Sequence, residues 1–330
     1  MPRFGDHTKM IRDAARPLER FSFPDSDFAL DVSQGLSNPH KALSPRFFYD
    51  SIGSALFEEI TQLSEYYLTR VEGAILGAHA AEIAYDEPLG GMLVEFGSGS
   101  SRKTEILLDA LPSLAAYVAV DVSESALYEA RSRLASRYPS LDIRPIVADF
   151  SYPIDYPLDL AELHRIGFFP GSTIGNLTPH EAVRLLVVMR NSLARSGRLI
   201  IGVDLKKDPR RLLAAYNDAA GVTAAFNLNL LARINRELAG SFDLKAFRHH
   251  AIYNAHEGRI EMHIISLKDQ SVTVIGQQIE FRAGERIHTE NSYKYAVEQF
   301  QGLARSAGWI ARRVWLDEDR LFSVHELISP

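Results

Sequence analysis

Short apolar runs that alternate with helical patterns from about residue 90 constrain the fold of this chain more than any other feature. The runs at residues 92–96, 117–121 and 143–147 have the length and composition of buried strands. Two more, at residues 166–169 and 198–203, continue the alternation. Because neighbouring parallel strands need long crossover connections, this rhythm predicts a parallel sheet that is covered by helices on both faces.

The helices expected between these runs supply the crossovers. They are predicted over residues 103–111, 123–138 and 180–194. Ser123 opens the second of them and can accept a hydrogen bond from a backbone N–H of its first turn.

The N-terminal part of the chain follows a different pattern. Residues 1–45 carry Pro, Asp, Ser and Asn at intervals, which indicates an irregular arm with turns at residues 23–25 and 37–39. In residues 45–81 apolar side chains recur every three to four positions, which predicts amphipathic helix.

Between about residues 206 and 290 the alternation of single strands and helices stops. A long, mostly polar helical region leads into segments of alternating polarity, which predicts an α+β insertion with an antiparallel sheet. The helical region is 208–238, and the strand-like segments are 250–254, 259–265 and 272–275. The chain closes with a helix over 295–307 and a hairpin of two strands over 311–316 and 322–328.

Composition excludes several classes of function. The net charge of −6 (36 basic against 42 acidic side chains) gives no general basic surface for nucleic acid. There are no cysteines, which excludes disulfides, thiolate nucleophiles and Cys-ligated zinc. No apolar stretch approaches the ~20 residues that span a bilayer, and the N-terminus carries charges where a signal peptide needs an apolar run. We therefore expect a cytoplasmic protein without nucleic-acid or membrane partners. We also expect a monomer, although composition does not bear on oligomeric state.

A glycine loop follows the first predicted strand. Gly97 and Gly99 would let the backbone approach a ligand without a Cβ in the way. Arg102 stands where a dinucleotide-binding fingerprint has its third glycine, and this departure counts against NAD.

Acidic residues end the next two predicted strands. Asp121 can accept hydrogen bonds from ribose hydroxyls, and Asp149 can accept one from an exocyclic amine. Phe150 can stack on an adenine ring. Ligands of open α/β sheets bind at the carboxyl ends of strands, so three consecutive strand ends carry suitable groups. The alternative is that both aspartates are helix caps.

This arrangement resembles the class I S-adenosylmethionine-dependent methyltransferases. More narrowly, the chain is similar to the histidine-specific methyltransferases of the ergothioneine pathway, which convert L-histidine to its Nα-trimethyl betaine, hercynine. The blocks that carry the resemblance are FYDSIGSALFEEIT, EYYLTR, EFGSGSSRKT, FFPGSTIGN and HTENSYKY, in that order from about Tyr49 to the C-terminus. Leu68, where the family usually has proline, and Tyr293, where a smaller residue is common, depart from the pattern.

The resemblance implies an α/β fold with two domains. A Rossmann-like domain that binds S-adenosylmethionine would comprise residues 70–205 and 294–330. A second, α+β domain of residues 1–69 and 206–293 would bind the substrate, L-histidine and its methylated intermediates, in a cleft between the two.

The resemblance also implies roles for individual residues. The cofactor contacts would be Gly97, Lys103, Asp121, Asp149 and Phe150. The amino-acid end of histidine would be held by the catalytic pair Tyr66 and Asn176 together with Tyr216, and its imidazole by Glu290 and Ser292. Near the reaction centre or the ring pocket would lie Tyr49, Gly171 and Met262.

The chemistry of the late polar pair agrees with an imidazole ligand. A neutral imidazole has one N–H donor and one lone-pair acceptor. Glu290 and Ser292 share a face if their segment is extended, so the carboxylate can accept the ring proton while the hydroxyl donates to the other nitrogen. A ligand without these ring atoms would leave a buried carboxylate unpaired. Neither Tyr66 nor Asn176 is a strong base, so the sequence identifies no general base.

Three other functions stay open at this stage. The same chemistry could act on tryptophan or tyrosine, a nicotinamide-dependent oxidoreductase could use the glycine loop and Asp121, and a cofactor-binding scaffold could lack catalysis. A metal is not expected, because His249, His250 and His263 have no further ligand at a recognised spacing.

Overall fold

The computed structural model describes residues 26–85, 87–99, 102–193 and 196–330. A seven-stranded sheet has the order β11-β12-β5-β4-β1-β2-β3, and its strands β5, β4, β1, β2 and β3 pair in parallel. β12 pairs antiparallel with both β5 and β11. The strands are β1 Met92–Phe96, β2 Ala116–Asp121, β3 Asp142–Val147, β4 Arg165–Phe169, β5 Arg198–Asp204, β11 Ile310–Leu316 and β12 Phe322–Ile328.

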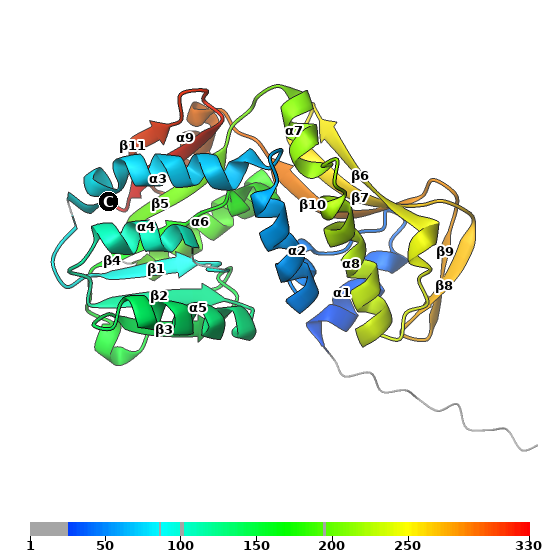
Figure 1. The fold of residues 1–330 in the computed structure, drawn as a ribbon, viewed down its shortest axis with the longest axis horizontal. Helices are drawn as coiled ribbons and strands as arrows, with labels where there is room; N and C mark the ends of the chain where they lie inside the picture. The colour runs from blue at the N-terminus through cyan, green and yellow to red at the C-terminus, as the bar shows by residue number, and fades with distance from the viewer. Residues whose placement is uncertain (1–25, 86, 100–101, 194–195) are drawn as a thin grey trace, which may run out of the picture.

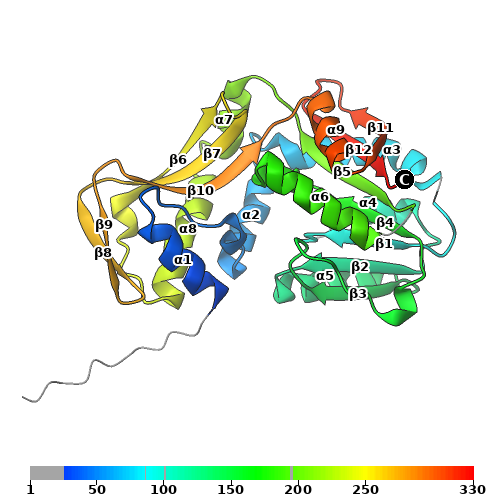
Figure 2. The same cartoon turned by 180° about the vertical axis from the view of Figure 1, so that it is seen from behind.

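Helices cover both faces of this sheet (Figures 1 and 2). Side chains of a strand alternate between faces, so Leu93 of β1 packs in one core and its neighbours Met92 and Val94 pack in another. The first core includes side chains of α3 Tyr67–Tyr85, α4 Arg102–Ala110 and α5 Glu124–Arg137. The second includes side chains of α6 Pro179–Leu193 and α9 Val297–Ser306. The expected α/β fold with a mostly parallel, doubly covered sheet is confirmed.

A second, antiparallel sheet of order β10-β7-β6 lies beside the first (Figure 1). Its strands are β6 Phe247–Asn254, β7 Arg259–Ser266 and β10 Arg286–Tyr293, and the separate hairpin is β8 Gln270–Val274 with β9 Gln277–Phe281. The helical elements of this half are α1 Asp27–Ser37, η1 Pro45–Phe48, α2 Ser51–Gln62, α7 Pro209–Tyr216, α8 Val222–Glu237 and η4 Leu244–Ala246. The antiparallel sheet expected for the insertion is confirmed.

The irregular N-terminal arm is wrong for residues 27–37, which form α1. Ser26 caps this helix by accepting a hydrogen bond from the backbone N–H of Ala29. Val32 and Leu36, one turn apart, are fully buried against the core. The repeat of apolar residues in α1 is short, and polar residues surround it, so the sequence pattern did not indicate a helix. The expected turn at 37–39 coincides with the end of the helix, and the one at 23–25 lies outside the described residues.

Two further differences concern the insertion. The helical region 208–238 is two helices, because Asp218 accepts hydrogen bonds from the backbone of Val222 and Thr223 and so starts α8 afresh. Strand β9 was not predicted, and β10 was considered only as a conditional extended segment. The division of the chain into two domains at residues 69/70, 205/206 and 293/294 remains a prediction.

Within the described ranges, no helix is both long and apolar enough to cross a membrane. In the same part of the chain, no group of three or more His, Cys, Asp or Glu side chains could hold a metal ion.

Candidate active site

The glycine loop after β1 has the backbone geometry that only glycine adopts freely. Gly97 has φ +72° and Gly99 has φ +46°. A Cβ on Gly97 would lie 3.3 Å from the ring of Phe150. The N–H of Gly99 donates to the carboxylate of Asp121 at 3.1 Å. The loop thus brings together three of the predicted cofactor residues, although its members Ser100 and Ser101 lie outside the described residues.

Both acidic strand ends also make local contacts. Asp121 accepts from the backbone N–H of Ser123 at 2.9 Å, and Asp149 accepts from that of Ser151 at 2.8 Å. Neither aspartate is a helix N-cap, because Ser123 caps α5 and the residues directly after Asp149 form a turn, so the capping alternative is wrong. These local bonds leave each carboxylate oxygen lone pairs for a ligand, since a carboxylate has about four acceptor sites.

Lys103 is tied to the loop that follows β4. Its ammonium pairs with the buried carboxylate of Glu72 on α3 at 2.5 Å. Glu72 also accepts the N–H of Gly171 at 2.8 Å. A Cβ on Gly202 of β5 would lie 1.9 Å from Glu72, so this glycine makes the room that the carboxylate occupies.

Asn176 ends the short helical turn η3 Thr173–Asn176, which contacts β10. A Cβ on Gly175 would lie 2.8 Å from the carbonyl oxygen of Tyr293. Ser172, in a left-handed conformation (φ 57°), accepts the backbone N–H of Asp204 at 2.9 Å. The loop that carries Gly171 and Asn176 is therefore held between the parallel sheet and β10.

Three tyrosines named from the sequence form one aromatic group with Phe57. The rings of Tyr66 and Tyr216 are 6.3 Å apart, and Phe57 lies 5.6 Å from Tyr49 and 6.3 Å from Tyr66. Burial raises the pKa of the Tyr66 and Tyr216 phenols, so both are neutral. Tyr49 keeps 36% of its surface exposed, but desolvation of its hydroxyl raises its pKa, and the nearby charges of Glu290 and Asp121 raise it further.

Glu290 lies opposite Met262 in the pairing of β10 with β7. The register shifts just before it, between His288 and Glu290, and the hydroxyl of Thr289 donates to the carbonyl of Met262 at 3.0 Å. Glu290 is 8% exposed, and burial raises its pKa to about 7 although the charge of Lys294 opposes this. Its carboxylate has no hydrogen-bond partner within the described residues. A buried carboxylate without a hydrogen-bond partner can accept a hydrogen bond from an N–H group of a ligand.

Ser292, two residues along β10, is connected to a buried cation. Its hydroxyl lies 2.7 Å from the hydroxyl of Tyr216 and accepts from Lys294 at 2.7 Å. Lys294 also donates to Tyr216 at 3.0 Å and pairs with Asp204 at 2.8 Å. Asp204 is held in turn by Tyr67, whose hydroxyl donates to it at 2.8 Å. Two of the predicted substrate residues, Ser292 and Tyr216, thus lie in one connected polar network with Lys294, Asp204 and Tyr67.

The sequence did not single out Glu72, which pairs with Lys103, nor three members of the polar network: Asp204, Lys294 and Lys207, the second lysine that pairs with Asp204. Lys294 offered a signal, because it continues the alternation Glu290, Ser292 within one strand-like block. Asp204 offered a weaker one, as an acid at the carboxyl end of a strand. In the sequence, Glu72 resembles any polar residue of a helix. Its burial depends on Gly202, which faces it from a distant strand and leaves room for its carboxylate.

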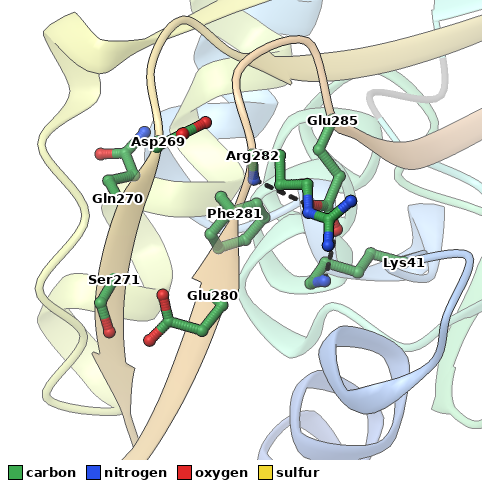
Figure 3. Close-up of a pocket in the computed structure, with 8 residues that line it drawn as sticks. All are labelled: Lys41, Asp269, Gln270, Ser271, Glu280, Phe281, Arg282 and Glu285. Atoms are coloured by element: carbon green, nitrogen blue, oxygen red, sulfur yellow. Dashed lines mark hydrogen bonds and ion pairs between the residues drawn. The ribbon is translucent and has the colours of Figure 1, made fainter.

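A surface hollow of about 530 Å³ lies elsewhere, on the β8–β9 hairpin at the opposite end of the molecule from the parallel sheet (Figures 1 and 3). Two of its charged groups, Lys41 and Glu285, pair with each other at 2.5 Å, as Figure 3 shows. It contains none of the predicted site residues.

Comparison with known proteins identifies the family. A family model described as "Histidine-specific methyltransferase, SAM-dependent" matches residues 28–329. The chain belongs to this family. The Histidine N-alpha-methyltransferase of Mycolicibacterium smegmatis is 41% identical over 292 residues, which cover 87% of this chain and 90% of that protein. Ergothioneine biosynthesis protein 1 of Neurospora crassa is 33% identical over 279 residues, which cover 81% of this chain but 31% of that protein.

Among solved structures, an S-adenosylmethionine-dependent methyltransferase from Clostridium acetobutylicum ATCC 824 matches with a TM-score of 0.49 and 14% identity. The match covers 83% of this chain and 97% of that chain, a likeness that does not bear on function.

Membership of the histidine-specific methyltransferase family confirms the resemblance and sets aside the nicotinamide-dependent alternative. The protein is a methyltransferase whose cofactor is S-adenosylmethionine. The structure fits this cofactor, because the tight glycine turn, the acid at the end of β2 and the half-buried Phe150 offer a close backbone, a hydroxyl acceptor and an aromatic face.

Proposed function

We propose that this protein transfers methyl groups from S-adenosylmethionine to the α-amine of L-histidine, three times in succession, and so forms hercynine for ergothioneine biosynthesis. The observation that carries the proposal is Glu290, a buried carboxylate without a hydrogen-bond partner among the described residues, next to the hydroxyl of Ser292. The relative named Histidine N-alpha-methyltransferase, 41% identical to this chain, supports the same substrate.

The imidazole of histidine would satisfy both members of this pair. Glu290 accepts the ring N–H, and Ser292 donates to the other ring nitrogen. Met262, opposite Glu290, supplies an apolar wall beside the ring. The pairing also stabilises the ionised form of Glu290, because an N–H donor replaces part of the hydration that burial removed.

When bound, S-adenosylmethionine would supply a methyl group on a positively charged sulfur, and that sulfur leaves as the neutral thioether of S-adenosylhomocysteine. The residues that we propose to hold this cofactor are Gly97, Lys103, Asp121, Asp149 and Phe150. In each round a bond forms from the amine nitrogen to the methyl carbon as the carbon–sulfur bond breaks. A proton leaves the nitrogen to water in the first two rounds, and the third product keeps a fixed positive charge.

The side chains of this enzyme mainly align the reactants and exclude water. We propose that Tyr66, Asn176 and Tyr216 hold the amino-acid end, with Tyr66 and Asn176 directing the lone pair of the neutral amine at the methyl group. The raised pKa of Tyr66 keeps its phenol protonated, so it orients the amine by hydrogen bonding and does not act as a phenolate base. Tyr49 and Gly171 would line the reaction centre.

The direct test is to incubate the purified protein with S-adenosylmethionine and L-histidine and to follow the products by mass spectrometry. We expect mono-, di- and trimethylated histidine. Parallel reactions with tryptophan and tyrosine serve as the comparison. Histidine that stays unmodified while one of these is consumed would overturn the substrate assignment, and no methylated product from any of the three would favour a non-catalytic role.

We also propose that the enzyme acts as a cytoplasmic monomer without nucleic-acid or membrane partners. The acidic net charge argues against a nucleic-acid partner, and the absence of cysteine agrees with a reducing compartment. Light scattering of the purified protein should give the mass of one chain, and the mass of two or more chains would contradict it.

A further inference from the structure

Lys294 has no exposed surface on its side chain, and its contacts occupy all of its donors. An ammonium has three N–H groups. They are directed at Asp204 (2.8 Å), Ser292 (2.7 Å) and Tyr216 (3.0 Å). Burial alone would lower the pKa of Lys294, but the charge of Asp204 outweighs this and raises it, so the ammonium stays protonated. No N–H of Lys294 is left to contact a substrate, and any effect on the substrate passes through its neighbours.

The contact with Lys294 limits what Ser292 can offer to a ligand. A hydroxyl has one O–H and two lone pairs. The ammonium occupies one lone pair of Ser292, and the hydroxyl of Tyr216, 2.7 Å away, fills the other when it donates. The O–H of Ser292 is then the only group left for a ligand. In the opposite arrangement Ser292 would accept a ligand N–H, whose positive hydrogen would lie beside the ammonium.

The charge also strengthens the hydrogen bond that Ser292 donates. Hydrogen bonds polarise one another along a chain, so an O–H whose oxygen accepts from a cation becomes a better donor. In a site of low polarity the ring nitrogen has lost its hydrogen bonds to water, so a stronger donor from Ser292 contributes more to binding.

We propose that Lys294 is a specificity-determining positioning residue that makes Ser292 a hydrogen-bond donor. Together with Glu290, which only accepts when ionised, it would make the site select a neutral imidazole with one N–H and one bare nitrogen. This inference rests on the proposed histidine methylation and adds the device that discriminates between rings.

The chain contains a matched control for this lysine. Lys207 is a second ammonium on the same carboxylate, Asp204, and its other contact is the hydroxyl of Tyr67 at 2.5 Å. No contact of Lys207 with Ser292 or Tyr216 is found within the described residues. Lys294→Met and Lys207→Met therefore each remove one buried charge from Asp204 and leave it the other, but only the first removes the donor to Ser292.

The measurement is the ratio of kcat/KM for L-histidine to kcat/KM for L-2-thienylalanine, whose five-membered ring carries no nitrogen. For Lys294→Met we expect this ratio to fall about tenfold, the difference between a charge-assisted and an ordinary hydrogen bond. For Lys207→Met we expect the ratio of the unmodified protein. In a Ser292→Ala background, Lys294→Met should not lower the ratio further, because the effect passes through that hydroxyl.

Binding of S-adenosylhomocysteine and the melting temperature report whether each variant is folded. If Lys294→Met does not fold, Lys294→Gln replaces it, because its amide has two N–H groups in place of three and no charge. The same fall in the ratio is expected for it.

The outcomes separate this inference from the proposed function. A ratio that falls equally in the Lys294 and Lys207 variants, or that stays at the unmodified value in both, would overturn the role of Lys294 alone. An unmodified protein that does not prefer histidine to 2-thienylalanine would overturn the proposed function and this inference with it.

Discussion

At the scale of single residues, the site depends on a carboxyl group that the protein fold disfavours as an anion. Glu290 is 8% exposed, and burial raises its pKa to about 7. The sequence predicted that this residue and Ser292 share a face if their segment is extended, and the structure places both on strand β10. It could not predict Lys294 as the partner of Ser292, because the position of that lysine depends on Asp204, which belongs to a distant strand.

The raised pKa of Glu290 predicts a pH-dependent cost to stability. The folded protein binds this proton up to about pH 7, whereas the unfolded chain releases it near its ordinary value of 4.5. Stability is therefore lost as the pH rises through this interval. Glu290→Gln removes the titration, so we expect it to raise the unfolding free energy by on the order of 2 kcal/mol at about pH 8 and to change it little at about pH 4.

Denaturant unfolding at the two pH values, without ligand, measures this difference. The buried Glu95, whose pKa burial also raises to about 7, is present in both proteins and cancels in the comparison. Equal stability of the two proteins at about pH 8 would show that Glu290 is not disfavoured as an anion.

Removal of the same side chain should reduce the preference for histidine. In Glu290→Ala the ring N–H of histidine loses its acceptor. We expect kcat/KM for histidine to fall about a hundredfold or more relative to kcat/KM for tryptophan, whose indole does not bind Glu290 and Ser292 together. Competition between the two amino acids in one reaction gives the ratio directly. An unchanged ratio would point to an indole substrate.

At the scale of elements, the strands and helices of the parallel sheet follow from local patterns, and their predicted bounds lie within a few residues of those observed. The pattern failed where an element is short or irregular. α1 has a short apolar stripe among polar residues, and the register shift in β10 leaves no trace in its sequence. A glycine can mark a place where two elements approach closely, but the sequence does not show which element lies opposite it.

Substitution of glycine by alanine should have opposite effects on stability at Gly202 and at Gly77. Gly202→Ala would place a methyl group 1.9 Å from the carboxylate of Glu72, which holds both Lys103 and the N–H of Gly171. We expect weaker binding of S-adenosylhomocysteine and a lower melting temperature. Gly77, on α3, has nothing within 4 Å of a Cβ, so Gly77→Ala should stabilise the protein by about 0.5–1 kcal/mol through helix propensity.

Calorimetric titration with S-adenosylhomocysteine and thermal unfolding of both variants test this contrast. Unimpaired binding by Gly202→Ala would mean that Glu72 does not organise the cofactor side of the site. A destabilised Gly77→Ala would mean that α3 is less regular than the structure shows.

At the scale of the whole molecule, Asp204 connects the two sheets. It ends β5 of the parallel sheet and binds the hydroxyl of Tyr67 at the start of α3 and the ammonium of Lys294 just after β10. The family resemblance predicted the fold, the cofactor and the substrate residues, and Tyr66, Asn176 and Glu290 lie in the blocks that carry it. It did not predict this connection, whose members lie in different parts of the chain and meet only in the folded protein.

Asp204→Asn should therefore destabilise the whole molecule. Two buried ammonium groups, those of Lys207 and Lys294, would lose their counter-charge, and we expect the unfolding free energy to fall by about 3–5 kcal/mol at neutral pH. Burial acts to raise the pKa of Asp204, but the two lysines outweigh it and hold the pKa below its usual value. The stabilisation is thus present at neutral pH and lost as the pH falls through the acidic range.

Denaturant unfolding of Asp204→Asn and of the unmodified protein at neutral pH measures the loss. Arg210→Gln, which removes an exposed ion pair with Asp208, is the surface control and should change stability little. A loss no larger than that of the control would contradict a role for Asp204 in joining the sheets.

A crystal structure with L-histidine and S-adenosylhomocysteine would show directly whether Glu290 and Ser292 hold the imidazole. We predict that one imidazole nitrogen lies within hydrogen-bond distance of the Glu290 carboxylate and the other within that of the Ser292 hydroxyl, with the α-amine facing the sulfur. A histidine bound elsewhere, or with its ring away from this pair, would contradict the proposed roles of Glu290 and Ser292.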